Sequence, residues 1–259
     1  MICIGVWGFQ RHLIYKPDTN IQSPQSYGLQ GFEDLRLKVA DGTVVQVWHH
    51  PAQTGFPTLI YFHGNAGNLG NYVNIFKIYA HAGFGILGLG YRGFGASQGS
   101  PAEQGLYQDA RAVIHYALKD LQIPKDKIIL YGKSLGSGVA VQMTIESPMA
   151  ALVLQSPYTS IAKRGQDRYP LLPVNLLIQD RFDSLSKIQH IHSPLLILHG
   201  EQDTIVPVED GKALFAAAPY PKTVVYFPLK GHNDFDNEKL LEELLTFSKE
   251  TKLISLKGS

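Results

Sequence analysis

The residues that could do chemistry centre on Ser134, which stands in the middle of the sequence G-K-S-L-G, Gly132–Gly136. An apolar run, Ile128–Tyr131, precedes this motif, and a helical pattern of small residues follows it. A G-x-S-x-G motif between a strand and a helix is typical of a sharp turn that exposes a serine hydroxyl. The glycines leave room for the strained backbone of such a turn. We therefore predict that Ser134 is a nucleophile.

Three glycine-rich look-alikes need a separate explanation. A second G-x-S-x-G, Gly95–Gly99 around Ser97, follows no apolar strand directly, so we interpret it as a loop. A phosphate-binding P-loop needs a further glycine five residues before the motif of Ser134, where Lys127 stands. The G-x-G-x-x-G over Gly88–Gly93 runs into more loop, and the acid about 20 residues on, Asp109, falls in a helical pattern. No nucleotide or dinucleotide is predicted.

A serine nucleophile needs a base and an orienting carboxylate, and both follow later strands. Asp203 comes shortly after the apolar run Leu195–Leu198, and His232 comes shortly after Val224–Phe227. The carboxyl ends of parallel strands meet at one edge of a sheet. Serine, acid and histidine also follow in the chain order that a strand–elbow–helix serine requires. We predict a triad of Ser134, Asp203 and His232.

Other residues compete for the two supporting roles. Glu201 is the nearest alternative acid, and a loop aspartate such as Asp203 often caps a helix or a turn instead. His63 and His199 each follow an apolar strand in an H-G dipeptide, but neither lies after the acid. His63 is expected to hold its loop in shape.

The oxyanion of an acyl-transfer reaction needs backbone N–H donors. The expected donors are the residue after the nucleophile, Leu135, and a residue in the loop after the strand Thr58–Phe62. That loop is rich in Gly and Asn, and it offers Asn65, with Ala66 as the alternate.

The elements that must position these residues alternate between strand and helix, which predicts an α/β fold with a mainly parallel sheet of about eight strands and helices on both faces. A hairpin over residues 32–48 is expected at one edge of the sheet. The other expected strands are Thr58–Phe62, Phe84–Leu89, Ile128–Tyr131, Ala151–Gln155, Pro194–Leu198 and Thr223–Phe227. The expected helices cover Tyr72–His81, Ala102–Leu121, the segment from the elbow to about Glu146, Val208–Ala218 and Glu238–Lys249.

One domain accounts for most of the chain. We assign residues 29–259 to it and residues 1–28 to an N-terminal arm, in which residues 10–31 are rich in Pro, Asn, Ser and Gln and are expected to be extended with turns. Residues 158–192 break the alternation after the sixth strand. They are expected to form a small insertion over the sheet.

Composition limits the partners. A hydrophobic share of 44% and a net charge of +1 indicate a globular protein that does not bind nucleic acid. The single cysteine, Cys3, excludes a disulfide framework and fits a reducing, cytoplasmic compartment. The histidine pairs His49-His50 and His190/His192 lack an H-E-x-x-H motif or carboxylate cluster, so no metal is predicted.

The first nine residues leave a membrane question open. Met1–Phe9 is apolar but far short of the roughly 18–20 residues that span a bilayer. It can be an arm packed on the body, the remnant of a longer anchor, or a segment lipidated on Cys3. Peripheral membrane association through the N-terminus therefore stays an alternative to a purely cytoplasmic protein, and the sequence does not indicate an oligomeric state.

With the elbow, the loop after Phe62 and the acid–histidine pair in place, the chain resembles an α/β-hydrolase-fold serine hydrolase of the Bem46-like group. The resemblance extends from Arg11 to the C-terminal helix and rests on several segments in the same order. These are His63–Asn68, Tyr91–Gly95, Gly132–Gly136, Asp180–Ser184, His199–Asp203 and Gly231–Asp234.

The resemblance implies cleavage of carboxylic esters or thioesters through an acyl-enzyme, with the same triad and no cofactor. The substrate would be a small ester, a lipid or an acylated protein. A peptidase or amidase is the alternative within the same fold, and a non-catalytic binding protein is the alternative in another class. Lys133 stands where relatives often have Arg or Gln.

Overall fold

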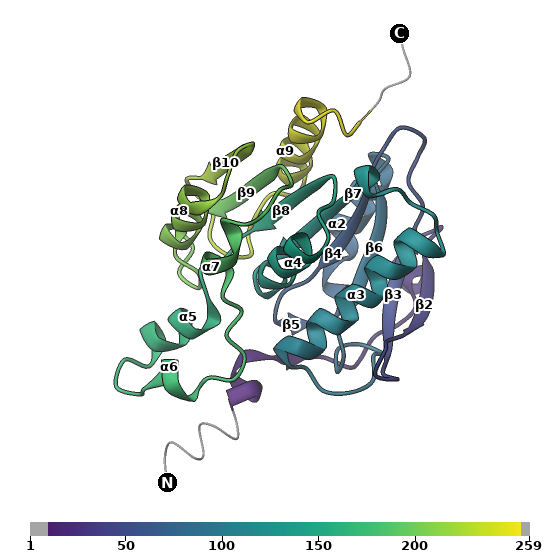
Figure 1. The fold of residues 1–259 in the computed structure, drawn as a ribbon. Coiled ribbons are helices and arrows are strands. Elements are labelled where there is room, and N and C mark those ends of the chain that lie inside the picture. Colours follow the sequence, from purple (N-terminus) through teal and green to yellow (C-terminus); the bar gives the residue numbers. More distant parts are fainter. Residues whose placement is uncertain (1–9, 255–259) are drawn as a thin grey trace.

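The computed structural model describes residues 10–254 and is built on one large sheet (Figure 1). Its eight strands are β2 (Glu33–Lys38), β3 (Val44–His50), β4 (Thr58–Phe62), β6 (Gly85–Gly90), β7 (Ile128–Lys133), β8 (Ala151–Gln155), β9 (Leu195–Gly200) and β10 (Lys222–Phe227). Across the sheet they lie in the order β10-β9-β8-β7-β4-β6-β3-β2. The predicted α/β class and the strand number are confirmed.

The sheet is mainly parallel, as predicted. Among the described strands of this sheet, β2 with β3 and β3 with β6 pair antiparallel, which places the predicted hairpin at one edge. The apolar strand β4 lies near the middle, between β6 and β7, and all five of its residues are buried. A strand covered on both faces needs apolar residues at consecutive positions, and this is the pattern of β4.

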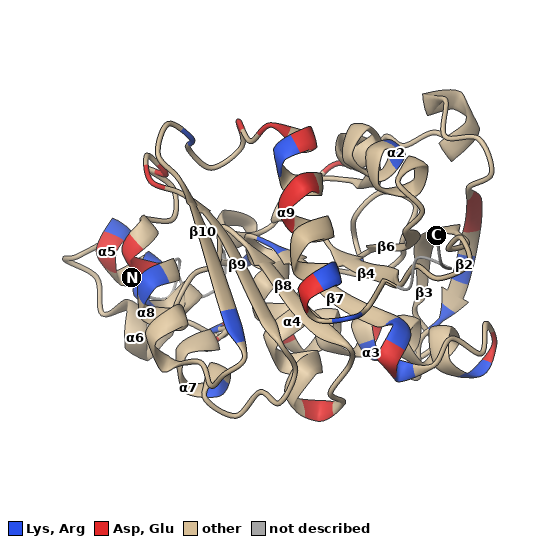
Figure 2. Cartoon of the chain, turned by 90° about the horizontal axis from the view of Figure 1, so that it is seen from above, with Lys and Arg blue, Asp and Glu red and all other residues tan. Residues whose placement is uncertain are grey.

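Helices cover both faces (Figure 2). Along β4, Ile60 and Phe62 pack into one apolar cluster, whereas Leu59 and Tyr61 pack into the other. The first cluster includes residues of α3 (Glu103–Lys119), α4 (Leu135–Glu146) and α8 (Val208–Ala217). The second includes residues of α2 (Val73–His81) and α9 (Asn237–Glu250). Each of these helices lies within two residues of the range expected from the sequence.

The insertion after β8 contains three short helices. They are α5 (Ile161–Arg168), α6 (Val174–Leu177) and α7 (Ser184–Ile188). In Figure 1, α5 and α6 lie beyond the carboxyl end of the sheet. The sequence predicted an insertion here but no helices, because Pro170 and Pro173 interrupt any helical periodicity.

The N-terminal arm is more structured than expected. Residues 10–14 are helical, and a 3-10 helix covers Pro24–Tyr27, so the expectation of an extended arm over residues 10–31 was wrong at these two places. Between them, β1 (Lys16–Pro17) pairs with β5 (Ala66–Gly67). This pairing ties the arm to the loop after β4. The predictions for Met1–Phe9, including lipidation of Cys3, lie outside the described residues.

Candidate active site

Ser134 lies at the turn between β7 and α4, where the backbone is strained. Its φ of 50° and ψ of −117° are a conformation that L-residues rarely adopt. The flanking glycines are required because any side chain at their positions would collide with nearby backbone atoms. A Cβ on Gly132 would lie 2.4 Å from the carbonyl oxygen of Gly136, and one on Gly136 would lie 2.0 Å from the carbonyl oxygen of Phe62. The turn places Ser134 in the lining of a cavity.

Ser134, His232 and Asp203 form one hydrogen-bonded chain. Nε2 of His232 lies 2.9 Å from Oγ of Ser134, and Nδ1 of His232 lies 2.6 Å from Oδ2 of Asp203. Because a carboxylate can only accept, Nδ1 of His232 carries the proton. Nε2 is then the acceptor for the hydroxyl of Ser134.

Asp203 is held as a carboxylate. Its Oδ1 accepts hydrogen bonds from the backbone N–H groups of Ile205 (2.9 Å) and Val206 (2.8 Å). Burial alone would raise the pKa of this side chain, but His199, His232 and the Val206 N–H favour the charged form and hold the pKa well below its usual range. Nε2 of His199 lies 3.5 Å from Oδ2 of Asp203.

The topology of the sheet brings these three side chains together. Ser134 follows β7, Asp203 follows β9 and His232 follows β10, and these strands run parallel within one sheet. The loops after β9 and β10 are in direct contact, because a Cβ on Gly200 would lie 2.2 Å from the carbonyl oxygen of Lys230. Glycine at this position lets the loops bearing the acid and the histidine approach each other.

The two competing histidines have structural partners. Nδ1 of His63 donates to the carbonyl oxygen of Gly64 at 2.7 Å, and burial lowers the pKa of His63 to about 4. Its ring packs against that of Tyr91, with centroids 4.4 Å apart. His199 is also fully buried, and its Nε2 donates to the carbonyl oxygen of Val206 at 2.9 Å. His199 thus supports the loop of the acid. The competing acid Glu201 is exposed.

The two expected oxyanion donors, Asn65 and Leu135, both line the same cavity as Ser134. Leu135 is the first residue of α4, where the helix dipole favours negative charge. The side chain of Asn65 donates to the carbonyl oxygen of Ile14 at 2.8 Å, and its own carbonyl oxygen accepts from the N–H of Lys16 at 2.8 Å. These contacts hold Asn65 in place and do not use its backbone N–H.

The glycine-rich look-alikes are structural. Oγ of Ser97 donates to the carbonyl oxygen of Gly90 at 2.6 Å and accepts from the N–H of Gln46 at 2.8 Å, so it links two strands. Arg92 forms a buried ion pair with Asp109 at 2.8 Å. Asp109 is thus buried in an ion pair and does not face a ligand site.

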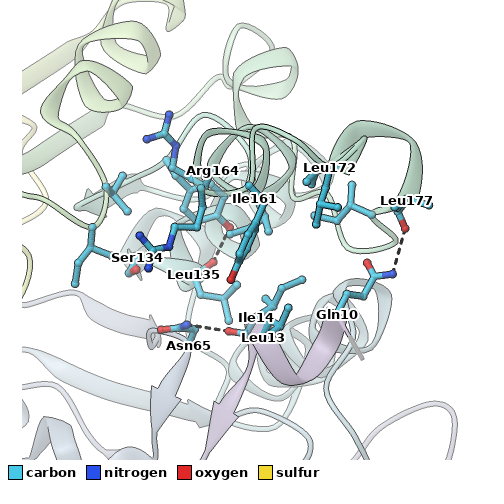
Figure 3. Close-up of a pocket in the computed structure, with 18 of the residues that line it drawn as sticks. Gln10, Leu13, Ile14, Asn65, Ser134, Leu135, Ile161, Arg164, Leu172 and Leu177 are labelled. Carbon is cyan, nitrogen blue, oxygen red and sulfur yellow. Dashed lines mark hydrogen bonds between the residues drawn. The ribbon is translucent and has the colours of Figure 1, made fainter. Parts of the chain in front are cut away.

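A cavity of about 590 Å³ opens at Ser134 (Figure 3). The N-terminal helical turn and the segment from α5 to Ile178 supply most of its wall. Tyr158 and Leu135 also line it, and the hydroxyl of Tyr158 donates to the carbonyl oxygen of Leu135 at 3.0 Å. The apolar residues that line it include Leu13, Ile14, Ile161, Leu172, Val174, Leu177, Ile178, Ile205 and Val206.

Asp180, whose role was not predicted from the sequence, holds this wall together. Its carboxylate accepts hydrogen bonds from Arg11 Nε (3.0 Å), the hydroxyl of Tyr15 (3.0 Å) and the N–H of Glu103 (3.1 Å). It therefore joins the N-terminal turn, the insertion and α3. Asp180 lies in a segment that carries the family resemblance, and Arg11 lies where the resemblance begins, but the spacing of the two residues predicts no contact across 169 positions.

Residues 10–254 lack two further features. No group of three or more His, Cys, Asp or Glu side chains in this part of the chain is placed to hold a metal ion. None of its helices combines the length and the apolar character needed to cross a bilayer.

This fold and this arrangement of residues define an α/β hydrolase. The family model described as "Serine aminopeptidase, S33" matches residues 56–179. Protein bem46 of Schizosaccharomyces pombe is 30% identical over 90% of this chain and 84% of its own length. The chain therefore belongs to the Bem46-like family of α/β hydrolases.

Other proteins are similar to this chain in sequence or in fold. An uncharacterised protein of Mycobacterium tuberculosis, Rv2307c, is 35% identical over 98% of this chain and 92% of its own length. The lysophosphatidylserine lipase ABHD12 of Danio rerio is 31% identical over 82% of this chain and 64% of its own length. Among solved structures, the esterase Pf2001 of Pyrococcus furiosus superimposes with a TM-score of 0.73 at 19% identity, over 91% of this chain and 96% of that one.

Proposed function

We propose that this protein is a serine hydrolase that cleaves carboxylic esters or thioesters through an acyl-enzyme on Ser134. The observation that carries the proposal is the hydrogen-bonded chain from Ser134 through His232 to Asp203. Ser134 at the end of this chain lines an apolar cavity. A nucleophile with a base and an orienting acid is the arrangement that acyl transfer needs.

In the acylation step, Oγ of Ser134 attacks the carbonyl carbon of the substrate and gives its proton to Nε2 of His232. The charge that His232 gains is stabilised by Asp203, which keeps its own negative charge. The bond to the leaving oxygen or sulfur then breaks, and His232 returns the proton to the departing alcohol or thiol. In the second half, a water molecule attacks the acyl-enzyme by the same route and releases the carboxylic acid.

The oxyanion that forms in each half would accept hydrogen bonds from the backbone N–H groups of Leu135 and Asn65. Both donors are fixed before the substrate arrives, because Leu135 begins a helix and Asn65 is tied to the N-terminal arm. Donors that need no rearrangement stabilise the transition state most effectively.

The lining of the cavity supports an acyl substrate over a peptide with a free amino terminus. Recognition of an ammonium group calls for a carboxylate, and none of the described residues that line the cavity is Asp or Glu. The apolar lining instead suits the hydrocarbon part of an ester. The lipase among the relatives points in the same direction, toward a small ester, a lipid or an acylated protein.

Hydrolysis of p-nitrophenyl esters from acetate to palmitate tests the proposal, with acyl-coenzyme A as the thioester and leucine p-nitroanilide as the aminopeptidase substrate. We expect turnover of esters or thioesters that is lost in Ser134→Ala, and no cleavage of the anilide. Full activity of Ser134→Ala would refute the role of this serine. Cleavage of the anilide in preference to all esters would favour the peptidase.

A further inference from the structure

Two leucines next to the cavity are almost completely exposed. Leu171 is 97% exposed and Leu176 is 87% exposed, and neither lines the cavity. The residue after each of them, Leu172 and Leu177, does line it. The loop between α5 and α6 and the end of α6 therefore direct one leucine of each pair into the cavity and the other into solvent.

Other exposed apolar residues surround the same opening. Leu13 is 53% exposed, Ile205 is 61% exposed and Tyr169 is 43% exposed, and all three also line the cavity. Together with the two leucines they form an apolar rim, which consists of Leu13, Tyr169, Leu171, Leu176 and Ile205. Exposed apolar side chains that gather at one place, rather than singly, mark an interaction surface.

The segment that carries most of the rim is basic. Residues 160–181 contain four Arg or Lys and two Asp. Figure 2 shows these charges close together on and around α5. Arg168 lies at the end of α5, is exposed, and forms no ion pair with any residue of the range 10–254. An exposed guanidinium beside protruding leucines suits a surface with an apolar interior and anionic groups above it.

The chain also enters the described structure at this rim. The side chain of Gln10 donates to the carbonyl oxygen of Leu177 at 3.1 Å and accepts from the N–H of Gln179 at 2.7 Å, so residue 10 lies against α6 (Figure 1). The sequence that precedes it, M-I-C-I-G-V-W-G-F, is apolar and carries no charged side chain. An uncharged apolar stretch thus joins the protein next to the rim.

We propose that the apolar rim docks on the surface of an anionic lipid bilayer, with Leu171 and Leu176 inserted among the lipids and Arg168 at the level of the phosphates. In this orientation the cavity opens toward the membrane. In a symmetric dimer through this face, the unpaired Arg168 of one copy would be buried against the same basic segment of the other copy. The repulsion between these like charges disfavours such a dimer. The docking involves no covalent step, so it is independent of the proposed hydrolysis.

Co-sedimentation of the full chain with vesicles tests the proposal, with Ser134→Ala as the background so that lipids are not consumed. The vesicles are either pure phosphatidylcholine or phosphatidylcholine with 30% phosphatidylglycerol. The test variant is Leu171→Ser with Leu176→Ser, because serine removes the apolar groups without adding charge. The control is Tyr220→Ser, because Tyr220 is also largely exposed (84%). Tyr220 precedes the amino end of β10, whereas the apolar rim lies beyond the carboxyl ends of the strands.

We expect the double variant to lose roughly tenfold or more of its partition onto anionic vesicles, and the control to stay within twofold. Arg168→Gln should weaken binding to anionic vesicles and leave binding to neutral vesicles unchanged. For the protein with Arg168 intact, 0.5 M NaCl should likewise weaken binding to anionic vesicles, because salt screens the attraction between Arg168 and the lipid phosphates. Hydrolysis of a soluble acetate ester by the double variant, made with Ser134 intact, checks that the fold is preserved.

Three results would overturn the proposal. One is equal binding of the double variant and the wild-type protein, which would place the attachment in residues 1–9 alone. Another is no binding of the wild-type protein to either kind of vesicle. The third is a wild-type dimer in sedimentation velocity that the double variant converts to monomer, because the rim would then be covered by a second copy.

Discussion

The change Asp203→Asn isolates the electrostatic and orienting role that we assign to this carboxylate. The substitution is nearly isosteric, and the position of its oxygen follows from the structure. Oδ1 accepts two backbone N–H groups, from Ile205 and Val206, at 2.9 and 2.8 Å. Turning the asparagine NH₂ group toward these donors would lose both bonds, at a cost of about 2 kcal/mol.

The asparagine NH₂ group therefore faces His232, at the place where Oδ2 now lies 2.6 Å from Nδ1. Two donors cannot share this contact, so His232 changes tautomer and carries its proton on Nε2. That nitrogen then presents a donor to Oγ of Ser134 and no longer accepts its proton. In a serine protease, the equivalent change lowers kcat by about 10⁴-fold, which corresponds to about 5 kcal/mol of transition-state stabilisation.

The assay is kcat/KM for p-nitrophenyl butyrate, with thermal unfolding to verify that the variant is folded. We expect a loss of about 10³- to 10⁴-fold in Asp203→Asn. Glu201→Gln is the matched control, because it neutralises an exposed acid in the same loop, and it should stay within twofold. A folded Asp203→Asn that keeps a tenth or more of the wild-type value would refute this account of the triad.

Three further predictions concern the turn, the loop histidine and the cavity. Gly136→Ala should lower the free energy of unfolding in urea by about 3 kcal/mol, because its Cβ would lie 2.0 Å from the carbonyl oxygen of Phe62; an unchanged midpoint would contradict the close contact. Burial lowers the pKa of His63 to about 4, so the unfolded chain binds more protons between pH 4 and 6.5, and stability falls as the pH falls through this range. Urea titrations at several pH values measure how much the free energy of unfolding falls between pH 6.5 and 4, and this decrease should be about 3 kcal/mol smaller in His63→Gln than in the wild-type protein. An equal pH dependence in the two proteins would contradict the lowered pKa of His63. Leu172→Trp should lower kcat/KM for octanoate esters about tenfold or more relative to acetate esters, because it fills the cavity; an unchanged ratio would place the acyl chain elsewhere.

Much of the fold could be predicted because its signals are local. The consecutive apolar residues of β4 indicate a strand buried on both faces, and the periodic apolar residues of α3 indicate a helix packed on one side. Strand order in such a fold limits where side chains at strand ends can lie. Ser134, Asp203 and His232 could therefore be placed near one another from their positions after three strands.

The cavity wall could not be predicted, because contacts that are distant in sequence build it. The carboxylate of Asp180 accepts hydrogen bonds from Arg11 and Tyr15, which are more than 160 residues away in the sequence. No sequence motif around either residue predicts this contact. Residues 10–14 are too few to form an isolated helix in water, so the protein body must stabilise this turn. The same is true of α6, which follows Pro173 and has only four residues.

The central claim is that Ser134 is the nucleophile, and covalent labelling tests it most directly. The folded protein is treated with a fluorophosphonate probe, digested and analysed by mass spectrometry. We predict a single adduct on the peptide that contains Ser134, formed much more slowly in Asp203→Asn. An adduct on another serine, such as Ser97 in the second G-x-S-x-G, or an esterase that forms no adduct at all, would contradict the claim.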